Sequence, residues 1–422
     1  MSIDQEKQTD IFSELFAQLP DDKFAKPQLD AKLNAKVEPD IDLSAAMKEA
    51  LAAPVFYPGL SESIFPGDSI AIVLQSDLPH PKLVLELLLE QLSSVNVEPT
   101  DIVVVVTART AEQIGIEPAL YEQPESNDPN GMPPPVFTVE FGFSGINFQV
   151  HNLENPAGLA YLVANEGAEP IHVNRIMVDA DVILPVATAA PGDIHQQTDC
   201  IFPDFSTLEI KRRFADGQGS FVSRWQEIEL ANDTLGAFFS IQLVVAPGNV
   251  IRQVICGARK DATDLARAAT NELWTFDWSG ESDVTVATIE TDSNDQTWDD
   301  FASALIMASR VSSTDGPLVV WSELSVSPDR KIRKACMSQF EDGISGKLTK
   351  TMQHVAAIVN ERPVYLRSRL KRNVVEELGL GFVESAQEVN RIAESRSNGL
   401  LIRDAQKCQF KDRTESGAGE SE

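Results

Sequence analysis

The chain has 422 residues, of which 43% are hydrophobic and 23% are charged. These fractions are ordinary for a globular protein and exclude a wholly disordered chain. Lys and Arg number 35 against 64 Asp and Glu, which gives a formal net charge of −29. Because so acidic a surface repels phosphate backbones and anionic lipid, the composition predicts no nucleic-acid partner and no membrane partner.

The cysteines and the first residues predict a cytoplasmic protein. Cys200, Cys256, Cys336 and Cys408 are far apart and show no zinc-binding spacing, so they are expected to be reduced thiols. The opening MSIDQEKQTD lacks the basic and apolar stretches of a signal peptide. Apolar runs such as residues 102–106 are too short to span a bilayer.

The first half of the chain predicts a parallel sheet after a short N-terminal segment. Residues 1–45 are expected to be extended with one short helix at 11–19, because prolines break anything longer. A buried strand at 69–74, a helix that opens at Pro81 and a strand at 101–107 then form a βαβ unit. Further strands are predicted at 136–141, 146–151 and 181–186. A hairpin is predicted from strands 240–245 and 250–256.

The strand and helix alternation restarts in the second half. Strands are predicted at 284–289, 318–321, 364–366 and 399–402, and helices at 298–311, 330–340, 347–359, 372–378 and 385–395. The sequence thus predicts an α/β fold of two domains with mostly parallel sheets and an interdomain cleft. The domains are expected at 46–272 and 284–405, with a linker near 273–283 and a disordered acidic tail at 411–422.

Three polar residues follow predicted strands and are candidate binding residues. Asp77 and His80 lie in the loop after the first strand, and Thr107 ends the second. Ligands of open α/β sheets bind beyond the carboxyl ends of the strands, so these residues are predicted to bind a ligand or cofactor. The alternative is structural: Asp77 caps the following helix, and Thr107 is a turn or cap residue.

Two histidines are the candidate catalytic groups. His151 ends a predicted strand, and His195 lies in a polar stretch near Asp193 and Asp199, which is a suitable environment for general acid and base catalysis. The alternative is that they are surface or capping histidines. The Walker A, GxGxxG, GxSxG and HExxH motifs are absent.

Several segments, in the same order along about residues 50–405, resemble the nickel-dependent lactate racemase family. They are LAAPVFYPGLSESIFPGDSIAIVLQSDLPHP at 51–81, DIVVVVTARTAEQ at 101–113, the VHN to VNR to DAD stretch at 150–190, PLVVWSELS at 317–325 and RPVYLRSRL at 362–370. The resemblance implies two α/β domains with the active site between them. It also implies a nickel pincer nucleotide that takes hydride from the α-carbon of a 2-hydroxy acid and returns it to either face.

The resemblance extends to several site residues. Asp77 matches the family's loop aspartate, Thr107 the threonine of its second strand, His151 the histidine of its "VHD" motif, and Asn174 its "NR" asparagine. His80 replaces the loop arginine, and Thr110 stands where the family has a catalytic histidine.

One family motif is missing. The stretch at 187–204 should hold the lysine that tethers the cofactor, but no lysine occurs between Ile176 and Ile210, and His195 does not match the motif. If the chain is an enzyme, the resemblance implies an isomerase that racemises or epimerises a 2-hydroxy acid or a related carboxylate. Covalent attachment of the cofactor is not expected, and the metal ligands stay open. The alternative is a non-catalytic ligand-binding or regulatory protein on the same fold.

Overall fold

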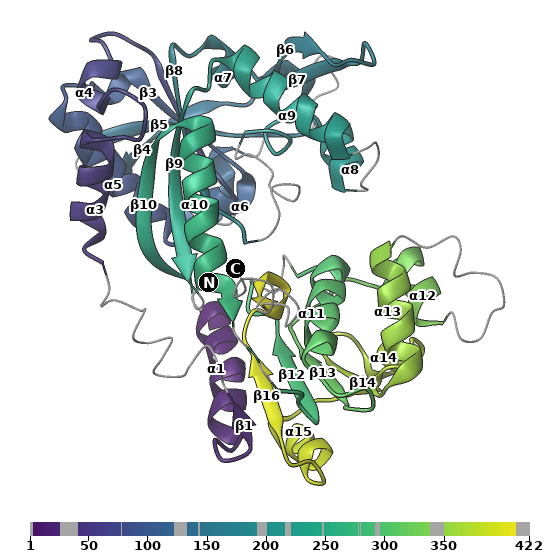
Figure 1. Cartoon of the computed structure of the whole chain (residues 1–422). Coiled ribbons are helices and arrows are strands. Elements are labelled where there is room, and N and C mark those ends of the chain that lie inside the picture. The colour runs from purple at the N-terminus through teal and green to yellow at the C-terminus, as the bar shows by residue number, and fades with distance from the viewer. Residues whose placement is uncertain are drawn as a thin grey trace, which may run out of the picture. The chain divides into compact units, whose positions relative to one another are not determined.

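Figure 1 shows a computed structural model of the chain, which forms two compact units. Unit 2 is the continuous stretch Pro39–Glu272, and unit 1 combines Met1–Glu38 with Leu273–Glu422. Unit 1 is therefore built from both ends of the sequence. The structure describes residues 3–25, 41–76, 78–121, 133–141, 144–191, 201–215, 221–246, 249–276, 278, 280–291, 296–337 and 350–410.

The main sheet of unit 2 has the strand order β10-β9-β8-β2-β3-β5-β4. From β9 to β5 all neighbours are parallel, while β10 and β4 pair antiparallel at the two edges. The strands are β2 Ile70–Leu74, β3 Ile102–Val106, β4 Val136–Phe141, β5 Ser144–Val150, β8 Val182–Thr188, β9 Phe239–Ala246 and β10 Val250–Ala258. The predicted βαβ unit and the predicted hairpin are thus confirmed.

Helix α5 (Pro81–Ser94) is an element whose start and buried face can be predicted from the sequence. Pro81 fits the first turn, where its missing N–H has no partner to lose. Val84, Leu85, Leu88 and Leu92 lie on one face and are buried. The other helices of unit 2 are α3 Leu43–Ala52, α4 Leu60–Ser63, α6 Ala108–Ile114, α7 Arg175–Asp179, α8 Leu208–Ala215, α9 Phe221–Leu235 and α10 Arg259–Trp274.

A second layer in unit 2 was not predicted. Strands β6 (Leu159–Ala164) and β7 (Pro170–Asn174) form a separate antiparallel hairpin. It shares a buried cluster with α7, α8 and α9, in which Phe202 and Phe205 are fully buried. Helix α9 mixes charged and apolar residues without a clean apolar stripe, so periodicity alone does not mark it.

Unit 1 is a fully parallel sheet in the order β1-β16-β12-β13-β14-β15. Its strands are β1 Phe24–Ala25, β12 Val284–Thr288, β13 Leu318–Trp321, β14 Val364–Arg367, β15 Gly381–Phe382 and β16 Gly399–Ile402. Its helices are α1 Ile3–Gln18, α11 Trp298–Arg310, α12 Arg330–Cys336, α13 Lys350–Glu361, α14 Arg372–Glu376 and α15 Ala386–Ala393. Two short strands, β11 Thr275–Phe276 and β17 Gln409–Phe410, pair beside it.

The N-terminal residues belong to unit 1. β1 pairs with β16, and Leu15, Leu19 and Phe24 are buried against the same cluster as Val286 and Leu401. Helix α1 begins at Ile3, earlier than the predicted start at residue 11. An α/β fold with mostly parallel sheets is confirmed, and the predicted cleft between the units stays a prediction.

The structure also bears on the predictions about membrane-spanning helices and about the cysteines. Among the described residues, no helix is long and apolar enough to cross a membrane. Cys256, Cys336 and Cys408 are buried and form no disulfide within the described part of the chain, while Cys200 and the tail at 411–422 lie outside it.

Candidate functional site

The carboxyl edge of the unit 2 sheet carries Thr107 and His151, two of the predicted site residues. β2, β3 and β5 are adjacent and parallel, so the segments that follow them share one edge. His151, just after β5, donates its backbone N–H to the carbonyl of Val106 in β3 at 2.7 Å. Thr107 follows directly, so the structure brings Thr107 and His151 together. Asp77 lies outside the described residues.

Thr107 has a clear structural role at this edge. It is the N-cap of α6, and its hydroxyl accepts a hydrogen bond from the backbone N–H of Thr110 at 3.3 Å. The hydroxyl of Ser76, after β2, donates to it at 3.3 Å, and the Thr110 hydroxyl lies 3.1 Å away. Thr107 is therefore a helix cap, as the structural alternative for this residue predicts. The hydroxyls of Ser76, Thr107 and Thr110 form one hydrogen-bonded row.

His80 occupies the N-cap position of α5 in a left-handed conformation, with φ of 50°. Its side chain makes no capping hydrogen bond and is exposed. A non-glycine residue in this region is uncommon and costs backbone energy. The imidazole is thus presented to solvent beside the first turn of α5.

Strand β8 is joined to the same edge through an amide. The side-chain oxygen of Gln75 accepts hydrogen bonds from the backbone N–H of Thr188 at 2.7 Å and from its hydroxyl at 3.2 Å. The segment that continues from β8 contains His195, which lies outside the described residues. Its predicted catalytic role stays a prediction.

His151 is a buried histidine with both ring nitrogens in use. Nε2 lies 2.9 Å from the carbonyl oxygen of Ser206, and Nδ1 lies 3.2 Å from the amide nitrogen of Asn174. A carbonyl only accepts and an amide NH₂ only donates, so Nε2 carries the proton and Nδ1 accepts. The ring also packs against Phe205, with centroids 5.4 Å apart.

Burial lowers the pKa of His151 from 6.5 to about 4. Desolvation of the charged form is the main cause, the hydrogen bond to Ser206 opposes it, and the positive charge of Lys211 adds to it. His151 is therefore neutral at physiological pH. A general base needs a free ring nitrogen within reach of the substrate, and in this arrangement His151 has none.

Asn174 holds this network together. Its amide nitrogen donates to the side-chain oxygen of Gln149 at 2.8 Å, and its own oxygen caps α7 by accepting from the N–H of Ile176 at 2.9 Å. Gln149, Asn174 and Ser206 are all buried. Neither Gln149 nor Ser206 is predicted from the sequence as a site residue. The signal for Gln149 is a polar residue amid the buried positions of β5.

The described residues of this edge do not fit a tethered nickel pincer nucleotide. Lys211, the first lysine after the missing motif, lies in α8 and pairs with Asp204 at 3.1 Å. Thr110 is fully buried, and both nitrogens of His151 are engaged. Within the described ranges, no group of three His, Cys, Asp or Glu side chains could hold a metal ion. Nickel in N, O and S sites needs such donors.

The corresponding edge of unit 1 is built from ion pairs. Between β12 and β16, where the strand order reverses, Arg403 donates from Nε to Glu290 at 2.9 Å, and Thr288 donates to the same carboxylate at 2.6 Å. After β13, the buried Glu323 accepts from Arg367 at 2.6 Å and also pairs with Arg369. These arginines hold the pKa of Glu323 below its usual value against the opposing effect of desolvation.

The fold is similar to that of solved structures. A lactate racemase apoprotein from Thermoanaerobacterium thermosaccharolyticum aligns with a TM-score of 0.62 and 12% identity, covering 93% of this chain and 96% of that one. A structural genomics target from Thermotoga maritima aligns with a TM-score of 0.53 and 13% identity, covering 92% and 99%. No family model and no curated protein matches the sequence. At these identities the likeness shows a lactate-racemase-like fold.

Proposed function

We propose that the protein binds a small 2-hydroxy acid or a related carboxylate at the carboxyl edge of β2, β3 and β5 without racemising it. The observation that carries this proposal is His151, whose two ring nitrogens are bonded to Ser206 and Asn174. Its pKa of about 4 leaves it neutral. A neutral imidazole with no free nitrogen holds a structure together and does not move a substrate proton.

The edge has the chemistry to bind such a ligand. Ser76 and Thr107 supply hydroxyls that can exchange their mutual hydrogen bond for bonds to a ligand's hydroxyl or carboxylate. Helix α5 begins at the same edge, and the positive end of a helix dipole favours an anion. The exposed His80 stands at that helix end.

The second candidate is an active isomerase of 2-hydroxy acids. The likeness to the lactate racemase apoprotein over 93% of the chain favours it. In that case the stretch that contains His195 would bind a nickel pincer nucleotide non-covalently, because Lys211 is paired with Asp204. In either case we place the protein in the cytoplasm, since buried free thiols suit a reducing compartment.

Co-expression with the enzymes that make the pincer nucleotide tests the two candidates. We expect the purified chain to have the mass of the bare polypeptide, to hold no stoichiometric nickel and to leave L-lactate unracemised. Titration with L-lactate should still shift the NMR signals of Ser76 and Thr107, and Thr107→Val should weaken that binding. Stoichiometric nickel with racemisation would replace our proposal by the isomerase. No shift at this edge would remove the binding site.

A further inference from the structure

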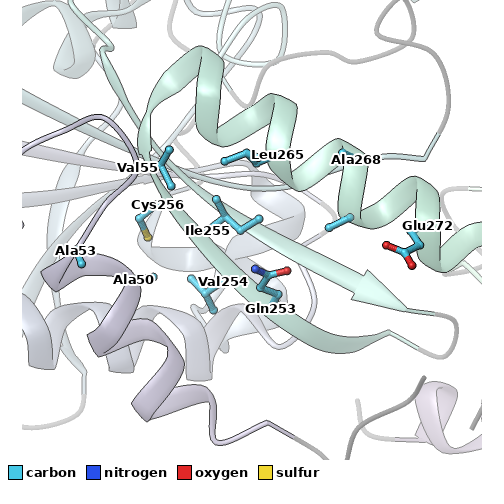
Figure 2. A pocket seen from close by; sticks show the side chains of 11 residues that line it. Ala50, Ala53, Val55, Gln253, Val254, Ile255, Cys256, Leu265, Ala268 and Glu272 are labelled. Carbon is cyan, nitrogen blue, oxygen red and sulfur yellow. The ribbon is translucent and has the colours of Figure 1, made fainter. Parts of the chain in front are cut away.

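A hollow of about 430 Å³ lies along the outer side of β10, the edge strand of the unit 2 sheet (Figure 2). Its volume is within the range of about 300–1,000 Å³ that ligand pockets have. Helix α3 contributes Ala50 and Ala53 to one wall, and α10 contributes Ala268 and Ala269 to the other. Residues 253–256 of β10 form the floor. This groove is separate from the carboxyl edge that carries the proposed ligand site.

One end of the groove already contains a backbone that pairs with β10. Val55 forms an isolated parallel bridge with Gly257. Its N–H donates to the carbonyl of Cys256 at 2.8 Å, and its carbonyl accepts from the N–H of Ala258 at 2.8 Å. Gly257 permits this approach, because a Cβ there would lie 2.2 Å from the Val55 carbonyl oxygen. The edge of β10 is thus built to accept an extended chain.

The pairing stops two residues upstream. Backbone groups of a strand alternate in direction, so Val254 points its N–H and C=O to the same edge as Cys256. Ala53, which would come next along the pairing chain, instead closes α3 by donating to the carbonyl of Glu49. Among the described residues, Val55 is the only one that pairs with this edge of β10. The position opposite Ile255 is therefore open.

We propose that this groove binds an extended peptide of another protein, which adds to β10 as a further strand. Its backbone N–H donates to the carbonyl of Val254, and its carbonyl accepts from the N–H of Cys256. The peptide continues the existing interface between Val55 and β10. This mode of recognition takes its affinity from main-chain hydrogen bonds and its selectivity from the side-chain walls.

The walls determine the kind of peptide. Four alanine side chains leave room for a backbone with small side chains, and Leu265, which is 47% exposed, offers an apolar contact. Small apolar residues such as alanine and valine fit this surface. A second copy of the chain does not, because its own β10 is recessed between the same two helices. A small apolar molecule would leave the edge N–H and C=O groups unpaired, which is costly once they are covered.

Residue-resolved amide exchange tests the proposal. The probe is acetyl-Ala-Val-Ala-Val-Ala-amide, added to the full chain. At ten times its dissociation constant it should slow exchange of the Val254 and Cys256 amides about tenfold, because only the free form exchanges. The same peptide with all five residue nitrogens methylated keeps its apolar side chains but loses its main-chain donors, so it should give no protection.

A pair of variants ties the effect to the groove. Ala268→Trp fills the groove from an exposed position of α10 and should abolish protection, whereas Asp261→Trp, exposed in the first turn of the same helix, should leave it intact. Equal protection by the N-methylated peptide would show an apolar ligand site and overturn the proposal. So would protection that Ala268→Trp does not change, self-association that protects the edge without peptide, or no protection at millimolar peptide.

Discussion

The two sheets of this protein carry different chemistry at their carboxyl edges. In unit 2 the edge is lined by hydroxyls, amides and the neutral imidazole of His151. In unit 1 the corresponding edge carries two ion pairs, one between Glu290 and Arg403 and one between Glu323 and Arg367. Parallel sheets place ligand sites at this edge, but the side chains decide whether a ligand can use it. Neutral hydroxyls can exchange partners easily, whereas buried ion pairs exchange them only at a high electrostatic cost.

The largest effect should come from breaking an ion pair of unit 1. Glu323→Gln removes the carboxylate that neutralises Arg367 and Arg369 and should lower the free energy of unfolding by roughly 3–5 kcal/mol. Urea unfolding measures this loss. Glu376→Gln, whose exposed partner Arg372 is 3.7 Å away, is the control and should cost less than about 0.5 kcal/mol. Equal losses would mean that the edge of unit 1 is not held by its buried charges.

The N-terminal helix offers a way to separate the units. Leu15→Ala empties a fully buried site in unit 1 and should cost about 3 kcal/mol. Hydrogen exchange should quicken in β16, against which β1 pairs, while β2 in unit 2 keeps its protection. Phe16→Ala, at a partly buried position of the same helix, serves as the milder comparison. Equal loss of protection in β2 and β16 would show that the units unfold together.

His151 predicts a pH dependence for unit 2. Its pKa is about 4 in the folded protein against 6.5 for an ordinary histidine, so as the pH falls the unfolded chain binds this proton first. The contribution of neutral His151 to the free energy of unfolding is fully present above about pH 6.5 and is lost between about pH 6.5 and 4. The decrease is at most about 3.5 kcal/mol, at about 1.4 kcal/mol per pKa unit.

The variant His151→Gln has no such proton to bind. Its unfolding free energy should therefore fall less steeply than that of the natural chain between pH 6.5 and 4. His354→Gln, at an exposed position of α13, should keep the natural slope. Urea unfolding at several pH values measures all three chains. Parallel curves would mean that His151 is accessible and protonated in the folded state.

The smallest effect concerns the hydroxyl row of unit 2. Thr107→Val removes the N-cap of α6 and should cost about 1 kcal/mol, as the loss of such a cap usually does. Thermal unfolding should register this difference. Thr234→Val is a matched control, because its exposed hydroxyl only bonds back to the Leu230 carbonyl within α9. If Thr107→Val left the thermal stability unchanged, the hydroxyl would have its role in ligand binding rather than in the fold.

Much of the fold could be predicted from local patterns. The buried strands β2 and β3 and the apolar face of α5 are continuous signals in the sequence, and their order requires a parallel βαβ unit. The same holds for β12 and β13 with α11 between them. The hairpin at β6 and β7 was missed, because its strands are exposed on one side and gain their order from packing against α9.

By itself, the sequence determined the α/β class, the central strands and the placement of Thr107 and His151 at strand ends. Only the tertiary structure decided what these side chains do. His151 bonds to Asn174, 23 residues away, and to Ser206, 55 residues away. Phe24 in β1 pairs with Gly399 in β16, near the other end of the chain. Hydrogen bonds and burial join residues that are distant in sequence, and a pKa follows from that environment rather than from the residue type.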